Sequence, residues 1–216
     1  MPRTYKIKEC FYTLQGEGAQ AGRAAVFLRF TGCNLWSGRE EDRHAAVCKF
    51  CDTDFIGTNG TNGGRYTQDE CVALARRLWP ANTGEELGRP YIVCTGGEPL
   101  LQLDVPLIEA LQAAGFEVAV ETNGTLPVPE QIDWVCVSPK AGAELAVTRG
   151  DELKLVYPQA EAAAQPECFT HLDFTHFFLQ PKDEVGRQHT PATVAYCMAH
   201  PRWRISLQTH KIMGIE

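Results

Sequence analysis

Three cysteines lie close together in residues 31–53, which read TGCNLWSGREEDRHAAVCKFCDT. Fourteen residues separate Cys33 from Cys48, and two separate Cys48 from Cys51. Because thiolates are soft ligands that select zinc, Cu(I) or iron-sulfur clusters, this grouping predicts a metal site. A structural zinc ion needs four protein ligands, and His44 is a candidate for the fourth. Three cysteines on a [4Fe-4S] cluster would instead leave one iron open for chemistry, and the spacing alone does not decide between the two.

Polar residues follow several β-rich runs. In YIVCTGGEPLLQ (91–102) such a run leads into two glycines, which let a ligand approach the backbone, and into Glu98, which can accept a hydrogen bond from an ammonium group. Later runs lead into Glu121 and Asn123, into 138–140, and into Gln180. Parallel α/β folds place their sites at the carboxyl ends of strands, although turn-forming residues are also common there.

The elements that would position these residues alternate between strands and helices. Helices are expected to start at Thr67, where Glu70 completes a capping box, at Asp104, and at Thr190. Strands are expected at 24–30, 91–95, 116–121, 133–138, 152–157, 176–180 and 204–208. Three helices are too few for an eight-fold barrel. We therefore predict an α/β fold, an incomplete TIM-like barrel of about six or seven mostly parallel strands with few helices, with an open α/β sheet as the alternative.

The chain is predicted to form a single domain over residues 1–216, because no internal repeat and no linker is evident. The segment 34–47 would be an inserted loop beside the metal site. The segment GTNGTNGGR (57–65) is rich in glycine and asparagine and predicts a flexible surface loop.

The composition excludes several classes of function. A formal net charge of -7 and an isoelectric point near 5.4 argue against nucleic acid as the ligand, because such binding relies on clustered Lys and Arg. The sequence contains no apolar run of about 18 or more residues, so no membrane segment is predicted. The N-terminus has no apolar signal region. The nine cysteines are odd in number and scattered, which fits reduced thiols. We therefore expect a cytoplasmic protein that binds a small molecule or another protein.

Together, the three cysteines and the GGEP turn (96–99) resemble the radical S-adenosylmethionine superfamily. The resemblance implies a [4Fe-4S] cluster on Cys33, Cys48 and Cys51, with S-adenosylmethionine on the iron that has no protein ligand. The usual motif of that superfamily has three residues between the first two cysteines, so this chain departs from it. Four further stretches resemble the 7-carboxy-7-deazaguanine synthase family: 11–34 (FYTLQGEGAQAGRAAVFLRFTGCN), 49–55 (KFCDTDF), 121–125 (ETNGT) and 137–142 (VSPKAG).

That resemblance implies a radical lyase reaction in the biosynthesis of 7-deazapurines of the queuosine type. The ring of 6-carboxy-5,6,7,8-tetrahydropterin would contract to 7-carboxy-7-deazaguanine with loss of ammonia. The radical would reside on the cofactor, so no side chain is assigned as catalytic. The resemblance also implies an electron donor such as flavodoxin or ferredoxin, a homodimer, and a Mg2+ ion.

The resemblance also assigns binding residues. Thr53 would bind Mg2+, although on sequence alone a threonine that caps a turn is the alternative. Arg29 would hold the substrate carboxylate, for which a surface ion pair is the alternative. The remaining substrate contacts would be Leu14, Gln15, Gly16, Glu17, Thr95, His210 and Glu216, of which the last two lie in a tail that is ordinarily disordered. S-adenosylmethionine would contact Phe50, Cys51, Asp52, Gly97, Glu98, Glu121, Asn123, Ser138, Pro139, Lys140 and Gln180.

Two other functions remain as alternatives. An activase that installs a glycyl radical on a partner protein would need the same cluster and cofactor. A binding module stapled by zinc would need no cofactor and no reaction. The LQGEG (14–18), CDT (51–53) and SPK (138–140) stretches favour the synthase resemblance as a set, although each is weak alone.

Overall fold

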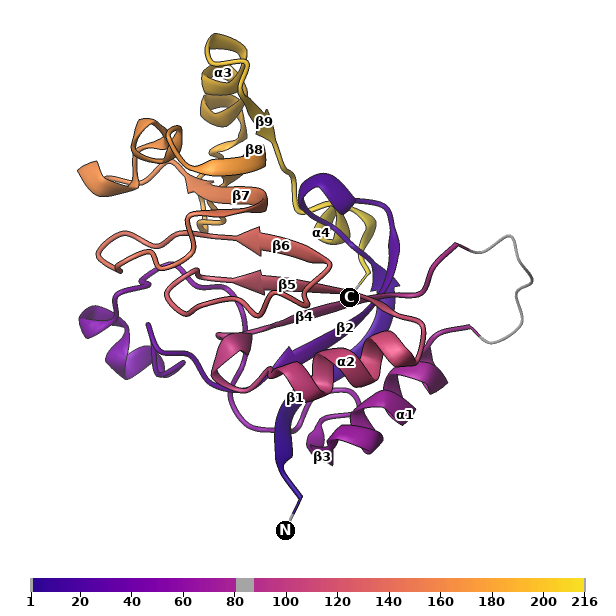
Figure 1. The fold of residues 1–216 in the computed structure, drawn as a ribbon. Coiled ribbons are helices and arrows are strands. Elements are labelled where there is room, and N and C mark those ends of the chain that lie inside the picture. Colours follow the sequence, from indigo (N-terminus) through magenta and orange to yellow (C-terminus); the bar gives the residue numbers. More distant parts are fainter. Residues whose placement is uncertain (1, 81–87, 216) are drawn as a thin grey trace.

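The computed structural model describes residues 2–80 and 88–215, and it contains one nine-stranded sheet (Figure 1). The strands follow the order β3-β1-β2-β4-β5-β6-β7-β8-β9. Their bounds are β1 Thr4–Leu14, β2 Ala24–Phe30, β3 Gly64–Thr67, β4 Tyr91–Gly96, β5 Glu117–Thr122, β6 Trp134–Val137, β7 Arg149–Tyr157, β8 Asp173–Pro181 and β9 Trp203–Ile205. The helices are α1 Gln68–Leu78, α2 Val105–Ala113, α3 Thr190–Ala199 and α4 Thr209–Met213, and short 3-10 turns include η1 Gly18–Gln20, η2 Glu40–Ala45 and η4 Pro99–Leu101.

The seven strands from β2 to β9, excluding β3, are parallel, as predicted. The end strands β3 and β9 are not paired with each other in the described residues, so the sheet does not close into a full barrel. The prediction of an α/β fold with about six or seven mostly parallel strands is confirmed. Because these strands share one direction, their carboxyl ends meet at one edge of the sheet, where the loops build the site.

Two antiparallel strands were not predicted. β1 pairs antiparallel with both β2 and β3. β1 and β3 are thus two strands beyond the parallel set. The 57–65 segment, predicted as a loop, ends in β3, where Gly64 and Arg65 pair with Ile7 and Lys6. A four-residue strand beside a glycine-rich stretch has too short a pattern to be recognised without its partner.

The predicted helix starts are largely confirmed. Thr67 and Glu70 form a reciprocal capping box at α1. The Asp104 carboxylate accepts from the Leu107 N–H at 3.3 Å, and caps α2. α3 begins at Thr190, with His189 as its N-cap and Pro191 as its second residue.

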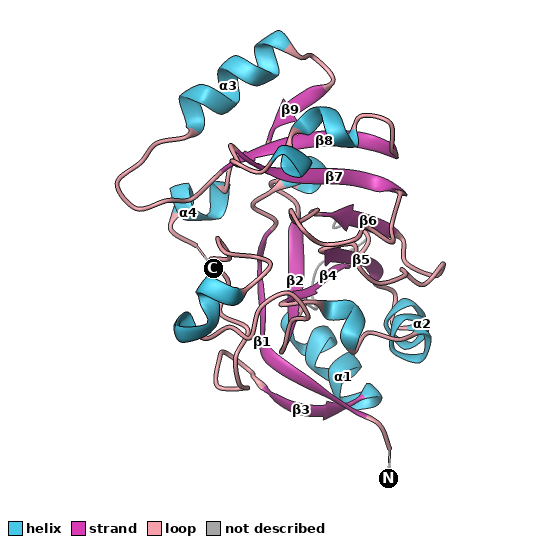
Figure 2. Ribbon diagram, turned by 90° about the vertical axis from the view of Figure 1, so that its left-hand side faces the viewer, coloured by secondary structure: helices cyan, strands magenta, loops and turns pink. Residues whose placement is uncertain are grey.

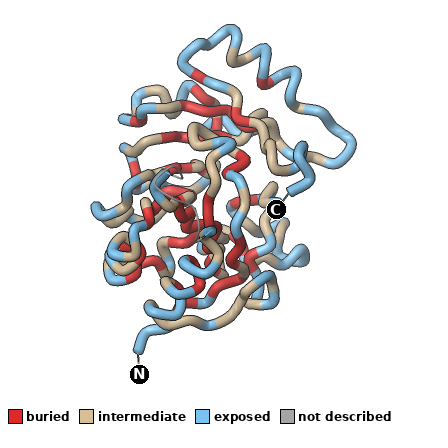
Figure 3. Tube along the Cα trace, turned by 90° about the vertical axis from the view of Figure 1, so that its right-hand side faces the viewer, coloured by how far each residue is buried: buried red, intermediate tan, exposed pale blue. Residues whose placement is uncertain are grey.

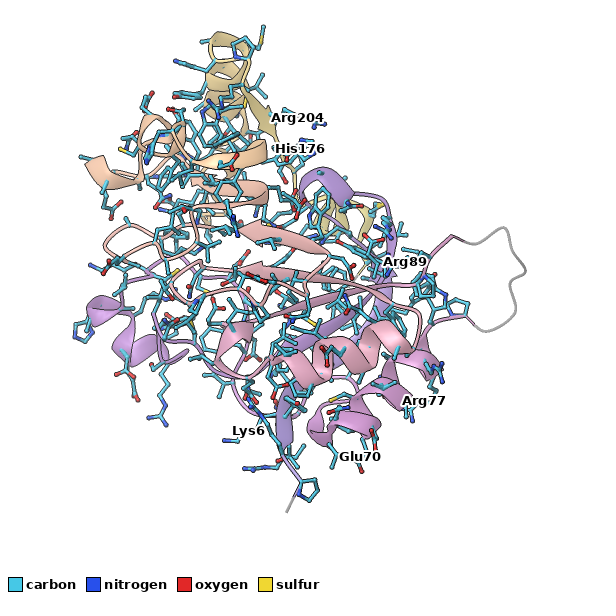
Figure 4. All side chains as sticks on the ribbon, in the orientation of Figure 1. Lys6, Glu70, Arg77, Arg89, His176 and Arg204 are labelled. Atoms are coloured by element: carbon cyan, nitrogen blue, oxygen red, sulfur yellow. The ribbon has the colours of Figure 1, made fainter. Side chains whose placement is uncertain are left out.

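The helices cover the two halves of the sheet unequally. α1 and α2 lie side by side against the core formed by β1, β2, β4 and β5, where Ile7, Leu28 and Leu107 are fully buried (Figures 1 and 2). α3 packs on β8 and β9 at the other end and is mostly exposed, as the pale-blue trace in Figure 3 shows. The charged side chains Glu70 and Arg77 of α1 point outward (Figure 4). Among the described residues no helix is both long enough and apolar enough to cross a bilayer.

Candidate active site

A cavity of about 410 Å³ lies at the carboxyl edge of the parallel strands, and all three clustered cysteines line it. Cys33 follows β2, whereas Cys48 and Cys51 come from the loop after the 34–47 insertion. A hydrogen bond from Cys48 lowers the pKa of Cys51 below that of an ordinary thiol, and the nearby Lys140 charge acts in the same direction. The CxxC pair therefore favours, at one of its two sulfurs, the thiolate form that binds metal.

The arrangement does not favour a closed zinc site. The His44 ring is exposed, its Nδ1 lies 2.9 Å from the Glu41 carbonyl oxygen, and it is not part of the cavity lining. Among the described residues no three His, Cys, Asp or Glu side chains are grouped to hold a single metal ion. In a [4Fe-4S] cluster each thiolate binds a different iron, so the thiolates need not converge on one point.

The two glycines after β4 allow its end to lie against the segment that leads to Cys33. Gly96 has a φ of +144°, and a Cβ there would lie 2.2 Å from the Phe30 carbonyl oxygen. A Cβ on Gly97 would lie 2.2 Å from the Gly32 oxygen and 2.8 Å from Cys33 Cβ. Any side chain at either position would therefore displace the backbone next to the first cysteine.

Glu98 is completely buried behind the cavity wall. Its carboxylate accepts hydrogen bonds from Leu100 N at 3.0 Å, Thr122 Oγ1 at 2.8 Å and Asn123 N at 2.8 Å. Glu98 is not among the residues that line the cavity. The carboxylate ties the end of β5 to the end of β4, and its expected contact with the cofactor amine stays a prediction.

A buried lysine connects the segment after β1 with the end of β5. Lys154 Nζ from β7 forms ion pairs with Glu17 Oε2 and, at 3.6 Å, with Glu121 Oε1. Burial would lower the pKa of Lys154, but Glu121 and Glu17 raise it well above its ordinary value. Burial would likewise raise the pKa of Glu17, yet the Lys154 charge lowers it overall. Both groups are therefore charged at neutral pH.

Three glutamines extend this network around the cavity. Gln15 Nε2 donates to Glu121 Oε1 at 3.0 Å, while Gln180 Nε2 and Gln208 Nε2 donate to Glu17 Oε1 at 3.2 and 3.0 Å. The side-chain oxygen of Gln180 is buried and has no hydrogen-bond partner among the described residues. Burying an acceptor without a donor costs free energy of folding. This indicates that a ligand with an N–H or O–H group would bind beside the Gln180 oxygen.

The C-terminal segment covers one side of the cavity. Thr209 N and Oγ1 both donate to the Gly16 carbonyl oxygen at 2.9 Å. The His210 ring lies against Gly16, since a Cβ at that glycine would be 2.1 Å from His210 Nδ1. Lys211 Nζ bridges Asp52 at 2.8 Å and Asp183 at 2.6 Å. The tail is thus ordered through α4, and the predicted contact at Glu216 lies outside the described residues.

Arg29 and Thr53 both line the cavity, as their predicted roles require. Arg29 Nε donates to Glu9 Oε1 at 2.7 Å, so the ion pair considered as the alternative is present. The pair is partly buried rather than on the surface, with 19% and 26% of the two side chains exposed. The roles of both residues in binding remain predictions.

The structure brings most of the predicted residues together in this cavity. Pro139 and Glu98 are the two described exceptions. The predicted residues that line the cavity are Leu14, Gln15, Gly16, Glu17, Arg29, Cys33, Cys48, Phe50, Cys51, Asp52, Thr53, Thr95, Gly97, Glu121, Asn123, Ser138, Lys140, Gln180 and His210.

Sequence reasoning missed several residues that line the same cavity. Lys154 had a usable signal, because a lysine within the apolar run ELKLVY needs a charged partner if its side chain is buried. Gln208, Lys211 and Glu9 had none, since their place in the site depends on contacts with segments far away in the sequence.

The residues present fit a thiolate-bound cluster with a small polar cofactor. Three thiols line one part of the cavity, and Gln180 offers an unused acceptor in its wall. Gly96 and Gly97 let the end of β4 lie directly against the backbone that leads to Cys33. The cavity volume is in the range of sites for small molecules.

Comparison with known proteins agrees with this description. The family model of the radical SAM superfamily matches residues 43–139, so the match begins inside the insertion and after Cys33. The 7-carboxy-7-deazaguanine synthase of Bordetella pertussis is 60% identical over 212 residues, which cover 98% of this chain and 99% of the relative. That of Burkholderia multivorans is 58% identical over 214 residues, with 98% and 99% covered. The crystal structure of QueE from Escherichia coli matches with a TM-score of 0.70 at 27% identity, covering 94% of this chain and 93% of that one. The chain therefore belongs to the 7-carboxy-7-deazaguanine synthase family of radical SAM enzymes.

Proposed function

We propose that this chain converts 6-carboxy-5,6,7,8-tetrahydropterin to 7-carboxy-7-deazaguanine with loss of ammonia, as a radical lyase of 7-deazapurine biosynthesis. The observation that supports this most directly is that three thiols line the same cavity as the buried Lys154 and its partly buried partners Glu17 and Glu121. Metal ligands and polar groups for small molecules thus share one site.

The two cofactors would bind in different parts of the cavity. When bound, the cluster supplies an electron and S-adenosylmethionine supplies the 5'-deoxyadenosyl radical that starts the rearrangement. Cys33, Cys48 and Cys51 would hold the cluster. Phe50 and Asp52 flank the last cysteine and would line the adenosyl pocket, while Glu121 and Asn123 would bind ribose hydroxyls.

The substrate would occupy the side of the cavity formed by the end of β1 and by α4. Gln15 and Glu17 offer donors and acceptors to a pterin edge, and Lys154 keeps Glu17 ionised. Arg29 would hold the substrate carboxylate, because the guanidinium has further N–H groups besides the one bound to Glu9. His210 on α4 would limit the entry of water.

Several parts of the proposal rest on resemblance alone. Mg2+ would bind the Thr53 hydroxyl together with substrate oxygens, since magnesium prefers oxygen ligands and keeps several waters. The electron donor would be a flavodoxin or a ferredoxin, and the protein would act as a homodimer. Residues 1–216 would work as one domain, with 34–47 as its insertion.

The covered cavity argues against the glycyl-radical activase. An activase must admit a loop of a partner protein, whereas here Thr209 and Lys211 tie the C-terminal segment to Gly16 and Asp52 across the site. A small-molecule cavity that is covered on one side fits a free pterin better than a peptide.

The decisive experiment uses the full chain, purified and reconstituted without oxygen. It is incubated with dithionite, S-adenosylmethionine and the carboxytetrahydropterin, and the product is identified by mass spectrometry. Formation of 7-carboxy-7-deazaguanine supports the proposal, and its absence from protein that contains about four irons and four sulfides refutes it. One zinc per chain and no sulfide would instead support the binding module.

A further inference from the structure

The 34–47 insertion is packed rather than loose. Trp36 is 7% exposed, and its ring meets the Phe55 ring edge to face at 5.6 Å. Trp36 Nε1 donates to the Arg39 carbonyl oxygen at 3.1 Å, which closes the turn. The Val47 N–H donates to the Leu35 carbonyl oxygen at 3.0 Å, so the two ends of the insertion are also joined. The insertion thus forms a folded unit anchored beside the cysteine loop.

Arg43 connects this unit to the backbone of the cysteine loop. Its Nη1 donates to the carbonyl oxygens of Lys49 and Cys51, at 3.1 and 3.2 Å. These two carbonyls lie on either side of Phe50, within the segment that presents the last cysteine. A single charged donor that binds both carbonyls restricts the backbone of this segment more than a neutral donor would.

The guanidinium itself is held in place on its other sides. Its central carbon lies 4.0 Å from the Trp36 ring centroid, and Glu40 forms an ion pair with Nε and Nη2. Only 27% of the Arg43 side chain is exposed, against 75% for Glu40. Because the planar group is fixed by stacking and by a carboxylate, little freedom remains to be lost when it binds the carbonyls.

We propose that Arg43 is a positioning residue of the cysteine loop, through which the insertion fixes the orientation of Cys51 toward Cys33 and Cys48. The proposal deepens the proposed function and depends on it for the role of the cluster. The contact between Arg43 and the loop can be tested without the cluster. The linker has fourteen residues where the usual motif has three, and the eleven additional residues give it room to present an arginine to the cysteine loop.

The test compares Arg43→Gln and Arg43→Lys with Arg39→Gln. Arg39 is the matched control, because it lies in the same insertion and has the same charge. Its side chain is 68% exposed, and its Nη1 lies 3.9 Å from Glu41 Oε1. Hydrogen exchange of the metal-free proteins is followed in peptides that span 49–53. We expect exchange there to rise roughly tenfold in Arg43→Gln, less in Arg43→Lys, and not in Arg39→Gln.

A second readout follows the reconstituted proteins. The rate at which a chelator removes iron should rise about tenfold in Arg43→Gln. The electron paramagnetic resonance signal of the reduced cluster should also shift in this variant. Arg39→Gln should match the wild type in both measurements. Unchanged exchange or an unchanged rate of iron loss in Arg43→Gln would overturn the inference. Faster exchange throughout β4 as well would also overturn it, because the effect would then be global. If loop exchange rises but even the wild type takes up no iron and sulfide, the proposed function fails while the positioning role stands.

Discussion

Replacing Lys154 by methionine tests whether the buried charge network holds the site together. Lys154 is 5% exposed and forms ion pairs with Glu17 and Glu121, while the Glu152 carboxylate lies nearby in the same strand. Methionine has similar length and no charge, so Lys154→Met leaves these buried and partly buried carboxylates without that cation. Breaking a buried ion pair from one side typically costs about 3–5 kcal/mol. For a chain of this length that loss corresponds to a fall in melting temperature of roughly 6–20 °C.

The loss should depend on pH in a defined direction. In the wild type the pKa of Glu17 lies below its ordinary value, so the stability that this group contributes is present above the unfolded pKa of about 4.3 and is lost only at lower pH. In Lys154→Met burial acts without the opposing charge, so the pKa of Glu17 should rise above the unfolded value. The carboxyl then takes up a proton as the pH falls, and the cost of burying its charge disappears. The destabilisation should therefore be larger at about pH 7.5 than at about pH 5.5.

Urea unfolding of the metal-free protein under reducing conditions measures this effect at both pH values. Lys6→Met is the matched control, because Lys6 is exposed on β1, and it should change stability by less than about 0.5 kcal/mol. The double variant Glu17→Gln/Lys154→Met removes one of the stranded charges and should recover about half of the loss. A loss below about 1 kcal/mol at neutral pH, or an equal loss at both pH values, would refute the reasoning.

Three further substitutions test other parts of the molecule. Glu98→Gln replaces a carboxylate that accepts three hydrogen bonds by an amide with one acceptor atom. We expect the free energy of unfolding, measured by thermal unfolding, to fall by about 1–3 kcal/mol. Calorimetry should also show weaker binding of S-adenosylmethionine, because Asn123 would be displaced. Full stability would contradict this role. Thr67→Ala removes the side-chain half of the α1 capping box and should cost about 1 kcal/mol in urea unfolding, with no change in iron content. Lys211→Ala removes the hydrogen bond from α4 to Asp52. Steady-state kinetics should show the KM for the pterin rising about fivefold, with unaltered cluster content. An unchanged KM would argue against the idea that α4 covers the cavity.

Much of the fold could be predicted because the parallel strands are short apolar runs that alternate with capped helices. Most residues of β4 and β5 are buried, and such apolar runs are recognisable without their partners. β1 and β3 escaped prediction because their pairing is antiparallel and long-range. Ile7, for example, is paired with Gly64, which lies in a loop-like sequence.

The candidate site likewise has features that the sequence predicts and features that depend on the tertiary structure. The cysteine spacing and the GGEP turn could be read directly, since ligand type and backbone freedom are properties of the residues themselves. The direction of the Glu98 side chain could not be read. Its partners Thr122 and Asn123 reach it only because β5 is the neighbour of β4 in the sheet.

The sequence by itself determined the chemistry that this protein can perform: three thiols for a cluster, a glycine turn for a cofactor, and polar residues after successive strands. The tertiary structure decided which groups share charge and how the cavity is covered. Glu17 and Lys154 are 137 residues apart, and Thr209 lies 193 residues from Gly16. No local pattern specifies such contacts, because they arise only when parallel strands bring their carboxyl ends to one edge and the last helix packs back over it.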